Sequence, residues 1–290
     1  MREPSPRTSR LTIAGGLLAV LCIGGGGFLL GRTTLSPPPP VTNEVVAVPT
    51  PPEEPPAAET RTLERADLAA LAGQAADAAA SGTPVPASIR EAVGRQFDLE
   101  LPFGCGGPAN EAETAPLSWS YDEAEEVLRI RVQPTAWAAA DWGIAAEAGV
   151  AIEGFWIPRP WSSHGTCPPR TVQAAVAGSE PVMLPGQTLA LAQFVAGDGR
   201  REALRGERPF ELVRRMPRAE FDGSQGFRVR LLGRIGSVPG GGPVRCVQPA
   251  GIEQRPICAI AVTLAEVRIE NPADGAVLAT WPIGGDSRAD

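Results

Sequence analysis

The first hydrophobic run of the chain has the length of a membrane span. Residues 11–31 are apolar, rich in glycine and free of charged side chains. As a helix they would extend about 31 Å, which matches the hydrocarbon core of a bilayer. Three arginines precede the run, and Arg32 alone follows it closely. This asymmetry predicts that residues 1–10 stay in the cytoplasm and that the rest of the chain is exported.

A cleavable signal peptide is the alternative interpretation of this run. Signal peptides have shorter apolar cores and a small-x-small cleavage site, and the sequence GRTTLSPP after the run offers no good site of that kind. Cys22 lies in the middle of the run behind Leu21, which disfavours a lipoprotein. We therefore expect residues 11–31 to anchor the chain in the lipid bilayer, with the cleaved form as the alternative.

The pattern after the anchor changes from proline-rich to helical. Residues 32–58 contain SPPPP and VPTPPEEPP, which favour a polyproline II spacer that cannot bury enough apolar surface to fold. Residues 59–81 are dense in alanine with a thin apolar stripe at helical spacing, and a second helix is expected over 86–97. Together these segments predict a helical lead-in over residues 59–100.

Short runs punctuated by glycine and proline follow over residues 101–290. Apolar residues alternate with arginine at 127–132, which predicts a half-buried strand that forms a hairpin with 117–121. Asp274-Gly275 predicts a second hairpin turn. Residues 135–143 read as a short helix or turn. The other predicted strands are 151–157, 171–177, 187–195, 208–214, 227–235, 257–270 and 276–283.

These elements together define the expected fold class. It is a mainly β exported domain, an antiparallel sandwich or barrel-like structure, with a short α-helical lead-in and one preceding transmembrane helix. No unit repeats at a fixed period, which disfavours a solenoid or a propeller.

Charge and composition narrow the possible partners. All 26 basic side chains are arginine, and glycine and proline are abundant, which indicates a GC-rich bacterial genome. Residues 33–290 carry 22 arginines against 32 acidic side chains, a net charge of −10. An acidic exported domain is a poor match for nucleic acid, so we expect no nucleic-acid partner.

Cysteine usage agrees with export. Apart from the cysteine in the hydrophobic run, four remain, and an even number outside the cytoplasm favours two disulfides. Three pairings are possible. We favour Cys246–Cys258, because the PAG between them suggests a reversing loop, together with Cys105–Cys167. A zinc site is disfavoured because His164 is the only histidine, and we expect no metal and no cofactor.

Candidates for catalysis are few. His164 lies in WSSHGTCPPR beside serines and a cysteine, although catalytic partners are rarely neighbours in sequence. The acidic residues at 122–126 fall in a predicted turn, where they would simply be solvated. Glu147 and Glu153 lie among tryptophans. The alternative function is therefore a hydrolase acting on envelope polymers, with its site near 142–164.

Aromatic residues are locally enriched. Five of the fifteen in the chain lie within 25 residues. Trp142, Trp156 and Trp161, with Arg159, form the candidate ligand-binding set. Exposed tryptophans can stack on sugar rings or hold a proline-rich peptide, and arginine can bind a carboxylate. The alternative is that these aromatics fill the core of a disulfide-bonded domain.

The layout is a short cytoplasmic tail, one span, a proline-rich spacer and a β-rich domain. It resembles in outline Gram-negative envelope proteins that span the periplasm, such as TonB-type energy transducers and the inner-membrane component of type II secretion. This resemblance concerns layout alone and assigns no site residue. The sequence thus predicts a single-pass protein of the bacterial inner membrane, non-enzymatic, whose periplasmic domain binds an envelope protein or a glycan.

Overall fold

The protein is mainly β, with two sheets, in the parts of the chain that the structure describes. The computed structural model describes residues 61–109, 115–145, 149–168, 188–197, 204–206 and 208–283. The predicted tail (1–10), anchor (11–31) and spacer (32–58) lie outside these residues, as does the predicted strand at 171–177. Between residues 61 and 283, no described helix is long and apolar enough to cross a membrane.

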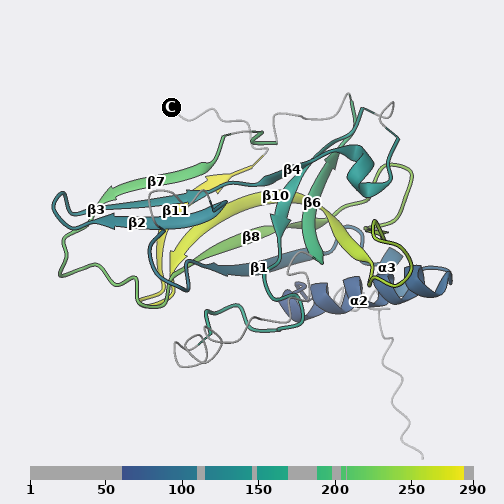
Figure 1. The fold of residues 1–290 in the computed structure, drawn as a ribbon, viewed down its shortest axis with the longest axis horizontal. Coiled ribbons are helices and arrows are strands. Elements are labelled where there is room, and N and C mark those ends of the chain that lie inside the picture. Colours follow the sequence, from purple (N-terminus) through teal and green to yellow (C-terminus); the bar gives the residue numbers. More distant parts are fainter. Residues whose placement is uncertain are drawn as a thin grey trace, which may run out of the picture. The chain divides into compact units, whose positions relative to one another are not determined.

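The larger sheet has eight strands and is built around the long strand β10 (Figure 1). Its strands are β1 (Gln96–Phe103), β4 (Thr135–Trp137), β5 (Ala151–Trp156), β6 (Leu189–Val195), β8 (Phe227–Ile235), β9 (Val244–Val247), β10 (Ile257–Asn271) and β11 (Ala276–Pro282). They follow the order β1-β8-β10-β6-β5-β4, with β9 and β11 also paired to β10. The first part of β10 pairs with β6 and β9, and the later part pairs with β8 and β11. Among the strand pairs of the described residues, β10–β6 alone is parallel. Because β10 pairs with four other strands, it organises the larger sheet.

The smaller sheet contains β2 (Leu117–Asp122), β3 (Val127–Val132) and β7 (Phe210–Arg215) in the antiparallel order β2-β3-β7. In β3, Ile130 is buried and its neighbours Arg129 and Arg131 are exposed. The predicted hairpin between β2 and β3 is therefore confirmed, and β7 adds a third strand to it.

Both sheets bury side chains in one hydrophobic core. Among its members are Leu99, Leu101, Trp119, Leu128, Ile130, Leu191, Phe210, Phe227, Val229, Leu231, Ile260 and Val267. At one end, the Trp119 ring contacts Phe221 and Phe227, with ring centroids 5.7 and 5.3 Å apart. Burial of these large rings is one of the apolar contributions that hold the two sheets together.

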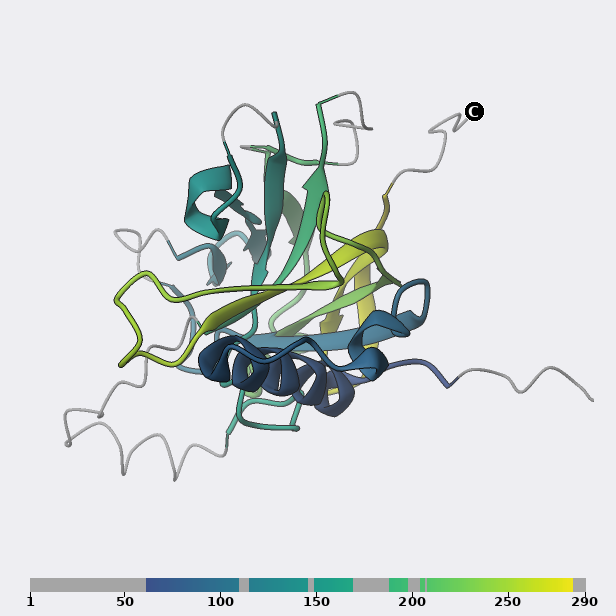
Figure 2. The same cartoon turned by 90° about the vertical axis from the view of Figure 1, so that its right-hand side faces the viewer.

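Helix α2 (Arg65–Ser81) covers one side of the larger sheet (Figure 2). It lies within the range predicted to be helical. The Asp67 carboxylate accepts the Glu64 N–H at 2.9 Å, which satisfies a free donor where the helix begins. Gly82 follows in the left-handed region at φ 64°, a conformation that ends helices readily.

The predicted helix over 86–97 is wrong beyond its first turn. Helix α3 spans only Ala87–Arg90, and β1 begins at Gln96, inside the predicted helical lead-in. Phe97 fits a helical spacing, but it also begins the alternation of F-D-L-E-L. The strand prevails because β1 pairs with β8 along eight residues and buries Phe97 against the core.

Two short strands were not predicted. Residues 135–143, expected to be a helix or turn, contain strand β4 and the 3₁₀ turn η1 (Ala139–Trp142). Strand β9 follows the glycine-rich segment 236–243. Strands of three or four residues show no readable alternation, and both are held by pairing to longer neighbours.

Both favoured disulfides are present. Cys246 and Cys258 are directly opposite each other in the β9–β10 pair, with Cα atoms 4.1 Å apart. Cys105–Cys167 joins the segment after β1 to the segment after β5, with Cα atoms 5.4 Å apart. Each bond fixes one of the segments that form the candidate site below.

Gly154 in β5 supplies a test of the packing between strands. A Cβ there would lie 2.0 Å from the backbone oxygen of Leu191 and 2.7 Å from the Cα of Ala192. Backbone atoms cannot rotate away, so we expect Gly154→Ala to lower the free energy of unfolding by about 3 kcal/mol. Gly73→Ala in α2, where no atom lies within 4 Å, is the control and should not destabilise. Equal losses in urea denaturation would contradict this prediction.

Candidate functional site

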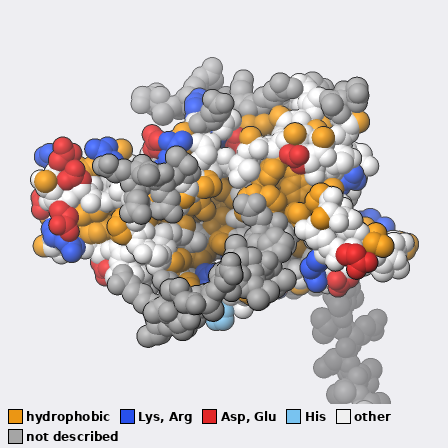
Figure 3. Space-filling view, in the orientation of Figure 1, with side chains coloured by type: hydrophobic (Ala, Val, Ile, Leu, Met, Phe, Trp, Pro, Cys, Tyr) orange, Lys and Arg blue, Asp and Glu red, His pale blue; other side chains and the backbone are white. Residues whose placement is uncertain are grey.

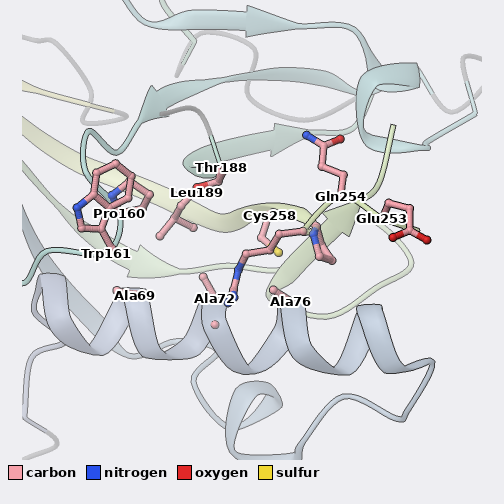
Figure 4. A pocket seen from close by; sticks show the side chains of 13 residues that line it. Ala69, Ala72, Ala76, Pro160, Trp161, Thr188, Leu189, Glu253, Gln254 and Cys258 are labelled. Atoms are coloured by element: carbon pink, nitrogen blue, oxygen red, sulfur yellow. The ribbon is translucent and has the colours of Figure 1, made fainter. Parts of the chain in front are cut away.

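The main candidate site is a groove between α2 and two loops, with a volume of about 510 Å³. Its lining is mainly apolar, and Figure 4 shows it from close by. The lining residues are Ala69, Ala72, Gly73 and Ala76 of α2; Pro160 and Trp161; Thr188 and Leu189; Glu253, Gln254, Arg255 and Pro256; and Cys258. We call it the α2 groove.

The floor of the α2 groove is a face of small side chains. Ala69, Ala72, Gly73 and Ala76 are spaced by three, one and three residues, so they share one side of the helix. In Figure 4 the three labelled alanines point from α2 towards the facing loops. Ala72 and Ala76 are 5% and 4% exposed and also belong to the core, so Ala69 and Gly73 are the floor residues that are more open to solvent.

Trp161 stands at one end of the groove beside Pro160 (Figure 4). Its side chain is 65% exposed, whereas most large aromatic side chains of the described residues lie in the core. Figure 3 shows that hydrophobic side chains also gather in the middle of the face seen there. An exposed tryptophan next to an apolar hollow is typical of a binding surface.

Arg65 holds the loop that carries Trp161. This first residue of α2 is 6% exposed. Its guanidinium donates to the carbonyls of Ser162 at 2.8 Å, Glu100 at 3.1 Å and Arg159 at 3.1 Å, and also to that of Pro158. Burial and the nearby Arg159 lower the pKa of Arg65, which still stays charged because arginine titrates far above neutrality. One buried cation thus ties α2, β1 and the Pro158–Ser162 loop together.

Charged side chains of both signs lie at the other end of the groove. The Arg255 guanidinium is 3.6 Å from the Asp77 carboxylate, and both side chains are mostly exposed. Glu253 and Gln254 are on the same loop. The Cys246–Cys258 disulfide closes this loop at its base.

The structure separates the four predicted ligand-binding residues. Trp142 is 1% exposed and packs with Trp137 and Trp156 in a second core cluster, with ring centroids 5.3–6.2 Å apart. Trp142 is therefore a core residue, which corrects its assignment to a ligand site, and Trp156 is half-buried in the same cluster. Arg159 donates to the Thr166 carbonyl at 2.7 Å within its own loop. Only Trp161 is in the groove lining.

The predicted catalytic candidates do not come together. His164 is exposed, and its backbone N–H donates to the Ser162 hydroxyl at 3.2 Å. Glu147 lies outside the described residues. Glu153 is 4% exposed and accepts the N–H groups of Arg205 at 2.8 Å and Gly206 at 2.6 Å. Its carboxylate therefore tethers a loop to β5.

No group of three or more metal-binding side chains is found in the described ranges. No family model matches the chain, and neither the curated proteins nor the solved structures contain a match. The fold and the candidate site together define a mainly β, disulfide-bonded domain with an apolar groove.

The groove residues were missed in the sequence for a physical reason. They come from four segments that lie far apart along the chain, and only the fold brings these together. The one local signal is the repeat of small residues at 69, 72, 73 and 76, which does not stand out in a segment dense in alanine. Nothing in the sequence distinguished Arg65 from the other arginines, because the sequence does not show which arginine is buried.

We expect Arg65→Met to lower the free energy of unfolding by about 3 kcal/mol, because hydrogen bonds to a charged group contribute more than neutral ones. The methionine side chain would leave four carbonyls without their donor. Arg61→Met is the control, since Arg61 is 66% exposed and pairs only with Asp67 at the surface; it should change stability little. Urea denaturation measures both, and similar values would show that Arg65 does not organise the loop.

Glu153 should give a defined pH dependence. Burial raises its pKa above the ordinary value of 4.5, although the two backbone N–H groups oppose the shift. The stability it contributes is thus fully present below pH 4.5 and is lost as the pH rises through its folded-state pKa. We expect the free energy of unfolding of wild type, relative to Glu153→Gln, to increase as the pH is lowered from neutrality towards 4.5. A difference that is constant with pH would contradict this, and Glu211→Gln at the surface is the control.

Proposed function

We propose that this protein is a non-enzymatic binding module of the bacterial cell envelope, and that the α2 groove takes an extended apolar peptide segment of another envelope protein. The observation that carries the proposal is the mainly apolar groove of about 510 Å³ bordered by the exposed Trp161. Tryptophan is among the residues most enriched at the energetic centres of interfaces.

The shape and chemistry of the groove favour a peptide. Its floor consists of small apolar side chains, and Pro160 and Pro256 give flat apolar walls. Glu253 and Arg255 place both signs of charge in the lining, which suits a polypeptide better than a polymer of one charge. Grooves lined by aromatic and proline side chains commonly bind extended, proline-containing segments.

We propose the following location in the cell. Residues 11–31 anchor the chain in the inner membrane, residues 32–58 form the spacer, and the β domain lies in the periplasm. The arginine asymmetry around the run and two disulfides, which persist in oxidising compartments, support this location. N-terminal sequencing of the mature protein tests it: an intact N-terminus is expected, and a mature chain that begins near residue 33 would overturn the anchor.

Two observations speak against the alternative that the protein is a hydrolase. Of its candidate carboxylates, Glu153 is buried and already accepts two backbone N–H groups. His164 is exposed and belongs to the loop after β5, outside the groove lining that the structure describes.

Trp161→Ala tests the binding proposal. The fragment Ala58–Asp290, which forms one compact unit, would be used to select peptides from a displayed random library. We expect apolar, proline-containing peptides to bind, and Trp161→Ala to weaken them at least about tenfold with an unchanged melting temperature. Val277→Ala, which removes another exposed apolar side chain outside the groove lining, is the matched control.

Two results would contradict the peptide proposal. One is binding that Trp161→Ala leaves intact. The other is retention of purified peptidoglycan glycan strands by the wild-type fragment, lost in Trp161→Ala, when no peptide binds. The second result would assign the groove to a glycan.

A further inference from the structure

Strand β7 has an open edge. It pairs with β3 along one side, and no strand in the described parts of the chain pairs with the other. Figure 1 shows β7 at the outer side of the three-stranded sheet, and Figure 3 shows charged side chains of both signs gathered at that end of the molecule. Val213, in the middle of β7, is 61% exposed. An unpaired edge of this length is a template for another strand.

The backbone groups that face the open edge can be identified. The Met216 N–H donates to the Glu126 carbonyl at 2.8 Å, in line with the β3–β7 register. Hydrogen-bonded and non-hydrogen-bonded pairs alternate along an antiparallel ladder, so Leu212 and Arg214 also direct their backbone groups to β3. The N–H and C=O groups of residues 211, 213 and 215 therefore point to the open edge.

The side chains of these same three residues share the outer face of the sheet, because side chains alternate with a period of two. They read Glu211, Val213 and Arg215: an acid, an exposed apolar residue and a base. In an antiparallel pairing centred on Val213, this face is complementary to itself. Val213 meets Val213 of the second copy, and each Glu211 meets an Arg215.

We propose that β7 pairs with β7 of a second copy of this chain. The two copies form a symmetric dimer with a continuous six-stranded sheet, in the order β2-β3-β7-β7-β3-β2. The two-fold axis is perpendicular to the sheet at Val213, so both outer faces lie on the same side. In this register the backbone groups on both open edges are hydrogen-bonded, and an apolar contact lies between two ion pairs.

The contacts within one chain leave these charges available. Glu211 is 3.1 Å from Arg131, and its side chain is 55% exposed. A carboxylate has two oxygens, so Glu211 can accept from Arg131 and from Arg215 of the second copy. Arg215 has no ion pair with any residue that the structure describes, and it is exposed. A partner strand must place a base opposite Glu211 and an acid opposite Arg215. The β7 strand of a second copy meets both requirements, which favours a second copy as the occupant.

Cysteine cross-linking of the full-length chain tests the register. Opposite residues of a hydrogen-bonded antiparallel pair have Cα atoms about 5.5 Å apart, which lies within the range of disulfides. We expect Val213→Cys to form an intermolecular disulfide under mild oxidation. Val277→Cys, at another exposed valine, is the matched control and should remain monomeric. Cross-linking of Val213→Cys no greater than that of the control would overturn the proposal.

A charge exchange in the Val213→Cys background separates this dimer from general adhesion of open edges. Glu211→Arg alone and Arg215→Glu alone each place like charges opposite one another at both ends, and should reduce cross-linking about tenfold. A mixture of the two variants, with different tags, restores both ion pairs and should give mainly the mixed dimer. Equal cross-linking in all combinations would overturn the assigned register. Because β7 contributes no residue to the α2 groove, this outcome is independent of peptide binding.

Discussion

Arg65 is a buried cation whose hydrogen-bond acceptors are all backbone carbonyls. It stands at the start of α2 and binds carbonyls of β1 and of the Pro158–Ser162 loop. Desolvating a guanidinium is costly, so its position is stable only while several acceptors surround it at once. The helix, the strand and the loop therefore hold one another in place. The groove between them is a consequence of this arrangement.

The sequence predicted most of the long strands, but not β1. In 127–132 and 227–235, apolar residues alternate with arginine. The arginines of 127–132 are exposed, whereas Arg228 and Arg230 are partly buried in ion pairs with Glu270. The sequence could not separate helix from strand at Phe97, where both spacings fit over a few residues. The choice there depended on β8, which lies about 130 residues further along the chain.

The candidate site was predictable only in part. The sequence singled out the aromatic segment but gave no means to tell Trp142 from Trp161, because composition does not report burial. In the fold, Trp142 packs among other rings, and Trp161 lies on a loop outside the sheet. Ala72 and Ala76 follow Leu68 on the same buried face of α2, and they line the groove where this face meets the loops that carry Trp161 and Arg255. That information resides in tertiary contacts.

The pairing of β1 with β8 has a consequence for the order in which the protein can be made. Strand β1 is synthesised early, yet the strand that satisfies its backbone is followed by only a few more elements before the end of the chain. The same holds for β6, whose parallel neighbour β10 comes later still. The β1–β8 pair therefore cannot form until β8 has been translated, and the β6–β10 pair forms later still. Until then, the backbone N–H and C=O groups of β1 have no strand partner, and such an unpaired edge can pair with another chain.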